Sequence, residues 1–385
     1  MSRRGARNPA ISGFSCLRCG TPLPVADYFE GCPGCRDAGF PASVHPLFDA
    51  WPAAVAAAGG HGCRRYAAWL AYSDWPSLGE GGTPLVDLPR IAAELGLATL
   101  ALKNEGGNPT GSHKDRMSML CVARALDIGA RTVVAASSGN AGVSLAAYAA
   151  RAGLGCVIVT MPGIGAGMRR AIEMHGAEIV VTPDSLSRWP YVRERVAGSG
   201  WYPATNHLNP PVGSNPFGVD GYRTLAFELA EAPGAGAIDH VVVPTARGDL
   251  LWGIARGFRD LQEAGLAGRV PRVHAVEPFP RVVRVLAGAE HRDGFPGTTA
   301  MASIAGGTVT LQTLNALALC GGTAVAVDDL GARADQAALA RSGLHLELSS
   351  AASLSGARAL IAGGVIARGE RVVLVGTAHG FKETA

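Results

Sequence analysis

The sequence predicts an α/β protein built on parallel sheets that helices cover on both faces. From about residue 78 onward, short apolar runs alternate with helical stretches. Strands that are apolar throughout belong to sheets buried on both faces. We expect strands at residues 133–136, 156–160, 179–181, 240–243, 273–276, 324–327 and 372–375. We expect helices at residues 143–151, 168–175, 250–264, 311–320 and 351–362, with left-handed caps at Gly153 and Gly176.

Composition narrows the class of protein. The chain has 385 residues, of which 48% are hydrophobic, and this length favours roughly two domains. A net charge of +3 argues against a nucleic-acid-binding surface, which needs a clustered basic face. The uncharged stretch 132–150 resembles a membrane span, but the polar turn at 137–140 interrupts it. With no export signal, we expect a cytoplasmic protein that binds neither nucleic acid nor membrane.

The first 40 residues differ from the rest because they contain two cysteine pairs. Twelve residues separate the second pair from the first. A two-residue gap lets a tight turn direct two thiolates at one metal, and four thiolates leave no open position. The spacing resembles a zinc ribbon and predicts a structural zinc; two disulfides or a metal-free remnant are the alternatives. The four candidate ligands are Cys16, Cys19, Cys32 and Cys35.

Four polar segments lie at or near strand ends, where ligands bind in parallel sheets. Residues 103–116 contain Lys114 among small turn residues. From the residues alone, Lys114 is either a surface lysine or an amine that attacks a carbonyl group. Residues 137–142 join a strand to a helix and would favour an anion, although capped helices commonly begin this way. The other two segments are 243–250 and 376–382.

Two motifs carry a family resemblance. Residues 108–116, NPTGSHKDR, are very similar to the lysine motif of fold-type II pyridoxal phosphate (PLP) enzymes, and residues 79–85, GEGGTPL, look like the lead-in of threonine synthases. The resemblance extends over roughly residues 78–382 and implies a tryptophan synthase β-like fold with two doubly wound parallel-sheet domains. We place the large PLP domain at 41–115 and 215–385 and the small substrate-loop domain at 116–214. The cysteine-containing residues 1–40 form the zinc-ribbon-like extension.

The resemblance also implies roles for individual residues. Lys114 would carry PLP and later move the α-proton of the substrate, Asn140 would bond the 3′-oxygen of PLP, and Thr377 would sit at its pyridine nitrogen. Glu105 matches a catalytic glutamate of tryptophan synthase β chains, although it could simply pair with Lys103 or Arg116. The PLP phosphate would bind at Ala246, Arg247, Gly248, Asp249 and Leu250, where Arg247 could instead pair with Asp249. The substrate would contact Ser137, Ser138, Ala141, Thr83 and His113.

Several residues depart from the threonine synthase pattern. In the segment 215–224, Gly218 replaces an arginine and Tyr222 replaces a glutamine. His113 replaces the usual phenylalanine before the lysine, and 303–308 lacks the expected Ile-Arg-Ile-Gly-Asn-Pro. These departures leave the cofactor prediction intact and weaken the prediction of the substrate.

We therefore expect a PLP-dependent lyase or synthase that acts on an amino acid with a side-chain leaving group. Threonine synthase, which converts O-phosphohomoserine to threonine by elimination and replacement, is the nearest named activity. A specialised β-replacement or elimination enzyme acting on phosphoserine or a related amino acid is the first alternative. A non-catalytic binding or regulatory protein with the same fold is the second. The family resemblance also implies a homodimer.

Overall fold

The computed structural model describes residues 5–232 and 238–383, which form two compact units. Unit 1 comprises Met1–Gly81, Asn108–Tyr222 and Glu383–Ala385, and unit 2 comprises Gly82–Gly107 and Arg223–Lys382. Within the described ranges, no helix is long and apolar enough to cross a membrane. The boundaries of the two units differ from the predicted domain boundaries at 40, 115 and 214. The predicted domains therefore stay a prediction.

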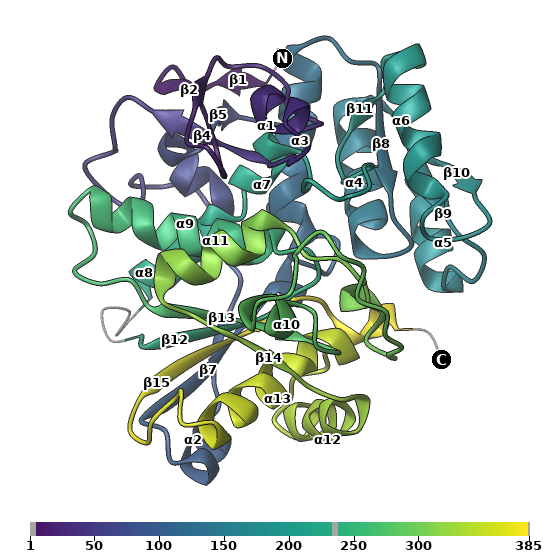
Figure 1. Ribbon diagram of the computed structural model, residues 1–385. Coiled ribbons are helices and arrows are strands. Elements are labelled where there is room, and N and C mark those ends of the chain that lie inside the picture. The colour runs from purple at the N-terminus through teal and green to yellow at the C-terminus, as the bar shows by residue number, and fades with distance from the viewer. Residues whose placement is uncertain (1–4, 233–237, 384–385) are drawn as a thin grey trace. The chain divides into compact units, whose positions relative to one another are not determined.

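Unit 1 contains a four-stranded parallel sheet in the order β10-β9-β8-β11. Helix α4 packs on one face of this sheet, and α6 packs on the other through Trp189 and Val192 (Figure 1). Helix α3 packs in turn against α4 and α7. The bounds are α3 (Lys114–Asp127), β8 (Thr132–Ala136), α4 (Asn140–Ala152), β9 (Gly155–Thr160), α5 (Ala166–Met174), β10 (Glu178–Val181), α6 (Arg188–Ser199), β11 (Tyr202–Pro203) and α7 (Pro216–Asp220).

The N-terminal part of unit 1 is a small antiparallel sheet in the order β3-β2-β4. Its core residue Phe14 is fully buried and packs edge-on against Phe217 of α7, with ring centroids 5.0 Å apart. The extension therefore shares its core with the helices of unit 1. The bounds are β1 (Ala6–Arg7), β2 (Ile11–Cys16), β3 (Pro22–Leu23), α1 (Pro33–Asp37), β4 (Val44–Phe48), η1 (Gly62–Trp69) and β5 (Tyr72–Asp74).

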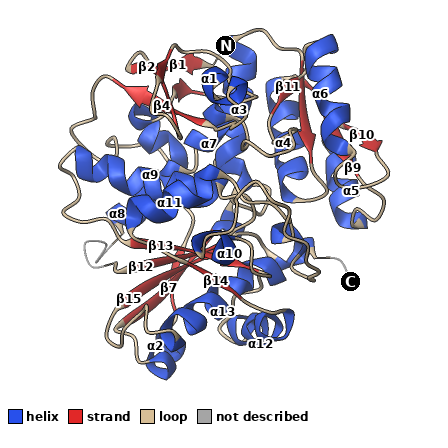
Figure 2. Cartoon of the chain, in the orientation of Figure 1, coloured by secondary structure: helices blue, strands red, loops and turns tan. Residues whose placement is uncertain are grey.

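Unit 2 is built on a six-stranded sheet in the order β14-β13-β12-β15-β7-β6. All neighbouring strands are parallel except the edge strand β6. Helices α9 and α11 lie on one face, and α2, α12 and α13 lie on the other (Figures 1 and 2). The strands are β6 (Leu85–Asp87), β7 (Thr99–Asn104), β12 (His240–Pro244), β13 (Arg272–Glu277), β14 (Ala324–Ala326) and β15 (Arg371–Gly376). The helices are α2 (Pro89–Leu95), η2 (Glu105–Gly107), α8 (Arg223–Glu231), α9 (Asp249–Glu263), α10 (Val282–Leu286), η4 (Ala302–Ile304), α11 (Leu311–Cys320), α12 (Asp329–Ala340), α13 (Leu348–Ala362) and η5 (Gly380–Lys382).

The predicted α/β class with parallel sheets is confirmed. Each of the twelve elements expected from the sequence is present, and no bound differs by more than three residues. Gly153 and Gly176 adopt the left-handed conformation as expected, with φ of 72° and 77°. One boundary matters for the site: α4 begins at Asn140, so this residue lies in the helix and not in the turn before it.

Two stacked histidines, His240 at the start of β12 and His274 in β13, lie in unit 2. The amide of Thr323 donates to His274 Nδ1 at 3.2 Å, so His274 carries its proton on Nε2 and donates to His240 Nδ1 at 2.9 Å. His240 must then donate from Nε2 to Glu370, also at 2.9 Å. Burial lowers the pKa of both histidines, that of His274 to about 3.

We expect the free energy of unfolding to fall as pH drops from about 6.5 towards about 3. In this range the unfolded chain protonates His274 and the folded chain does not, which costs up to about 1.4 kcal/mol per pH unit. Urea unfolding between pH 7 and 5 measures the slope. The variant His274→Gln should flatten the slope, and an unchanged slope would show that this histidine does not titrate on unfolding.

Candidate active site

Lys114 is the first residue of α3 and ends the polar turn of the lysine motif. Asp115 fixes this turn, because its buried carboxylate accepts from the hydroxyl and the amide of Thr110 at 2.5 and 2.7 Å. The same carboxylate accepts from Ser144 Oγ of α4 at 2.6 Å. The turn that presents Lys114 is therefore tied to α4.

Asn140 begins α4 as Lys114 begins α3. Ser144 and Ser118, each four residues further along, are joined by a hydrogen bond of 2.7 Å. Because four residues make about one helical turn, the two helix starts lie at the same end of the helix pair. The structure thus brings Lys114 and Asn140 to one end of unit 1.

The two serines before Asn140 shape the start of α4. Ser137 Oγ accepts from the amides of Gly139 and Gly142 at 3.2 and 3.1 Å. Ser138 Oγ accepts from Thr160 Oγ1 at 2.9 Å and from Arg188 Nη1 at 3.1 Å. Ser137 thus binds two amides at the start of α4, as a structural role requires. Substrate binding by both serines, and by Ala141 in the first helical turn, stays a prediction.

Lysine is rare in this chain, which narrows the choice of a reactive amine. The chain has three lysines, Lys103, Lys114 and Lys382. Lys103 is buried, and its Nζ lies 2.6 Å from both the Glu228 carboxylate and the carbonyl of Thr83. Lys382 lies in the last turn of the described chain. Lys114 is the lysine whose turn also carries the family motif.

Glu105 lies in unit 2, in a buried network. It is fully buried, and Thr83 Oγ1 donates to its carboxylate at 2.6 Å. Glu228 accepts from the amide of Gly82 at 2.9 Å and forms the ion pair with Lys103. These bonds fix the segment that includes Gly82 and Thr83. Fixing this segment is a structural role, which is the alternative to catalysis for Glu105. A catalytic role for Glu105 and a substrate contact by Thr83 stay predictions.

The turn from β12 to α9 could form a cradle for an anion, as the family resemblance implies for 246–250. Gly248 precedes α9 with φ of 80°, a conformation that favours glycine, and a Cβ there would lie 2.1 Å from Thr313 Oγ1. Asp249 and Leu250 form the first turn of α9, where backbone amides have no acceptor within the helix. Burial lowers the pKa of Arg247, and the Asp249 carboxylate partly offsets this. An anion at this turn would meet amides at the positive end of the α9 dipole.

The start of α11, which follows Thr310, contributes unpaired polar groups beside this cradle. Thr310 Oγ1 donates to the carbonyl of Arg247 at 2.6 Å. Thr313 Oγ1 and both polar atoms of the Gln312 amide are buried and have no hydrogen-bond partner among the described residues. Buried polar groups are rarely left unpaired, so these atoms fit a polar ligand such as the phosphate of PLP.

Arg281 binds the backbone of the turn between β12 and α9. It is fully buried and donates to the carbonyls of Thr245 at 2.8 Å, Ala246 at 3.1 Å, and Gly306. These contacts occupy carbonyl oxygens that would otherwise repel an anion. Sequence reasoning missed Arg281, because it lies 34 positions after Arg247 and no motif marks it.

Alanine in place of Gly248 should weaken PLP binding by about tenfold to a hundredfold, because its Cβ would clash with Thr313 and its φ would be strained. Gly265, at the other end of α9, offers a matched control: φ is 72°, and nothing lies within 4 Å of its would-be Cβ. Spectroscopic titration with PLP measures both variants. Equal affinities for Gly248→Ala and Gly265→Ala would contradict the assignment of the cradle.

Thr377 follows β15 and is buried in unit 2. Its Oγ1 lies 2.7 Å from Ser350 Oγ in α13, and the same serine oxygen accepts from the amide of Ala378 at 2.9 Å. Ser350 therefore orients the hydroxyl that the family resemblance places at the pyridine nitrogen. Sequence reasoning missed Ser350, because its pairing with Thr377 depends on how α13 packs on β15.

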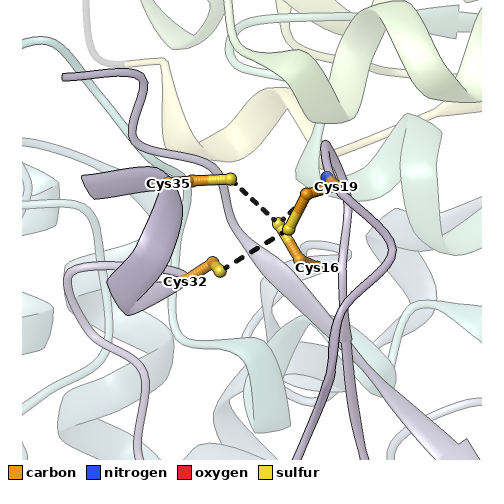
Figure 3. Close-up of side chains that lie close together, drawn as sticks. All are labelled: Cys16, Cys19, Cys32 and Cys35. Carbon is orange, nitrogen blue, oxygen red and sulfur yellow. Dashed lines mark hydrogen bonds between the residues drawn. The ribbon is translucent and has the colours of Figure 1, made fainter. Parts of the chain in front are cut away.

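The four N-terminal cysteines converge at one point (Figure 3). Their Sγ atoms all lie within 4.8 Å of one another, with Cys16–Cys35 at 3.6 Å and Cys19–Cys32 at 3.9 Å. Four sulfurs around a tetrahedral zinc are about 3.8 Å apart, whereas disulfide sulfurs are about 2.05 Å apart. The cysteines are free thiols in the structure. The cluster fits a structural zinc and not the two disulfides of the alternative.

The comparisons with known proteins agree with this geometry. Residues 76–378 match the family described as pyridoxal-phosphate dependent enzyme. The chain is 32% identical over 328 residues to threonine synthase of Methanosarcina acetivorans, covering 83% of this chain and 80% of that protein. It is 33% identical over 315 residues to threonine synthase of Mycobacterium leprae, covering 80% and 85%. The solved structure of O-ureido-L-serine synthase aligns with a TM-score of 0.62 and 25% identity, covering 78% of this chain and 90% of that one.

Proposed function

The chain belongs to the family of pyridoxal-phosphate-dependent enzymes, and on that basis we propose that it eliminates or replaces a side-chain group of an amino acid, with threonine synthase as the reference activity. The predictions of the family, the fold type, an enzyme and PLP as cofactor are confirmed by the family match and the relatives. The choice of amino acid and the roles of single residues are our proposals.

The observation that carries the proposal is the placement of Lys114. Of three lysines, it is the one that begins a helix beside Asn140 at a shared helix end. Bound PLP would supply an electron sink for the α-carbon of the substrate. Lys114 Nζ would hold the cofactor and then take the α-proton as a base.

The other residues would position the reactants. Asn140 would bond the 3′-oxygen of PLP, and the cradle at Gly248 with Thr313 would hold its phosphate. Thr377, oriented by Ser350 at 2.7 Å, would face the pyridine nitrogen. A hydroxyl there does not keep that nitrogen protonated as an aspartate would, which suits elimination and replacement at the β or γ carbon.

A second candidate, an enzyme acting on a phosphorylated or otherwise activated serine, is favoured by the surroundings of Gly218. The resemblance of this segment to threonine synthases implies an arginine at that position. Here a Cβ would lie 2.9 Å from Met117 Cγ and 3.1 Å from the Met117 carbonyl. The helix packing thus leaves no room for the arginine, so a cation for a longer phosphorylated side chain would have to come from elsewhere.

We would test the proposal by incubating the PLP-loaded protein with O-phospho-L-homoserine and with O-phospho-L-serine. Phosphate release and the mass of the amino-acid product are the measurements. Threonine formation from the first substrate supports threonine synthase, and release from the second alone supports the serine candidate. A protein that holds PLP but turns over neither compound would speak for the binding-protein alternative.

We also propose that the protein works in the cytoplasm as a homodimer, as the family resemblance implies. Its partner molecule is then a small amino acid, with a second copy of the chain as the protein partner. Sedimentation of the full chain at micromolar concentration tests the assembly, and a monomeric mass would refute it.

A further inference from the structure

Tyr222 contacts the amine of Lys114 within unit 1. The tyrosine is fully buried at the junction after α7. Lys114 Nζ donates to Tyr222 Oη at 3.2 Å and lies 5.6 Å from the centroid of the tyrosine ring. The His113 ring also contacts Tyr222, with its centroid 5.5 Å from that of the tyrosine ring. The Tyr222 phenol thus contacts both the Lys114 amine and an imidazole.

The backbone around Tyr222 fixes this position independently of the lysine. A Cβ at Gly221 would lie 1.8 Å from the carbonyl of Arg116, so the turn packs directly on the first turn of α3. One residue earlier, the Asp220 carboxylate accepts from the amide of Ala71 at 2.8 Å. Tyr222 is therefore held against Lys114 by the fold and is not a mobile side chain that happens to lie near it.

Two ring side chains from distant parts of the sequence meet beside Lys114. The rings of His113 and Tyr222 contact each other, although the residues are 109 positions apart. Of the two, Tyr222 directs a hydroxyl at the lysine amine.

We propose that Tyr222 is a catalytic partner of Lys114, which orients the free amine and stabilises its protonated form; this inference rests on the proposed role of Lys114. The phenol oxygen accepts from the ammonium, and the phenol proton can be donated to the neutral amine. Lys114 therefore keeps one partner in both protonation states whenever it is not attached to the cofactor. The bond to the ammonium is the stronger of the two because it is charge-assisted.

The other ionisable groups on α3 and on the elements packed against it either have partners of their own or are exposed. Asp115 accepts from Thr110 and Ser144. Arg116 Nη1 lies 3.5 Å from Cys63 Sγ. Further groups are Asp220 of α7 bound to Ala71, Glu80 bound to Tyr148 of α4, Asp127 bound to Tyr72 of β5, Arg124 bound to Asp27, Asp74 of β5 bound to Arg64, and the exposed Arg7 of β1 and Arg151 of α4. His113 is thus the titratable neighbour that the control experiments must include.

The test is the pH profile of Lys114 modification in the full cofactor-free chain. Acetic anhydride acylates neutral amines, and mass spectrometry resolves the three lysines, with Lys382 as an internal reference. Tyr222→Phe keeps the ring and removes the oxygen, so the midpoint of the Lys114 profile should fall by about one pH unit. Tyr222→Gln restores a group that both accepts and donates, and should stay near the wild-type midpoint. His113→Phe reports how much of any shift comes from the imidazole.

Tyr202→Phe is the matched control, because Tyr202 is equally buried and its hydroxyl lies 3.3 Å from Asp27 Oδ1. It should leave the Lys114 midpoint unchanged. A midpoint that does not move in Tyr222→Phe overturns the inference, as does an equal shift in Tyr202→Phe. Borohydride reduction of the PLP-loaded wild type followed by peptide mapping tests the proposed function separately, since it asks only whether Lys114 carries the cofactor.

Discussion

Lys114→Ala is expected to abolish attachment of PLP to the chain and to lower turnover at least about 10³-fold, because the variant has lost both the attachment point and the base. Lys103 cannot substitute, since its Nζ is buried against Glu228 and the Thr83 carbonyl at 2.6 Å. The fold should survive, because alanine is a good helix former and Asp115 still fixes the turn.

Borohydride reduction and peptide mapping measure the attachment, and phosphate release from O-phospho-L-homoserine or O-phospho-L-serine measures turnover. Lys382→Ala is the matched control, because it removes a lysine from the last described turn of unit 2. This control should keep both the attachment and the turnover. Full turnover by Lys114→Ala would refute the mechanism, whereas lost turnover in both variants would indicate a general defect.

The sequence predicted those parts of the site that depend on local pattern. Apolar runs such as 240–243 form strands wherever a parallel sheet buries both faces, and β12 begins at the predicted residue. The Cys-x2-Cys spacing likewise predicts a cluster, because each pair forms its own turn. The position of Lys114 at a helix start follows from the same kind of local motif.

Contacts between distant segments could not be predicted in this way. Tyr222 reaches Lys114 because Gly221 lets one turn press on α3, and Thr313 reaches Gly248 because α11 packs on α9. Neither contact has a periodicity or a motif, since each depends on how two separate elements pack. The unpaired amide of Gln312 could not be predicted either, because a polar side chain points to a ligand only when the fold buries it away from water.

The cysteine cluster should be necessary for the integrity of unit 1 beyond the extension itself. Arg124 of α3 pairs with Asp27 of the extension at 2.7 Å, and Phe14 packs on Phe217 of α7. Helix α7 leads directly into Tyr222, the partner of Lys114. A structural zinc contributes its binding free energy to folding, so its loss should loosen these contacts as well.

We therefore expect Cys16→Ser to lose bound zinc, to lower the melting temperature by about 10 °C and to weaken attachment of PLP at Lys114. Elemental analysis, thermal unfolding and peptide mapping measure the three effects. Cys156→Ser removes an equally buried thiol outside the cluster and should retain zinc. A Cys16→Ser protein that loses zinc but keeps the wild-type melting temperature and PLP attachment would show that the metal does not stabilise the packing of the extension on α7. Melting and attachment that fall together would instead show that the metal supports the catalytic lysine through Phe14 and Phe217.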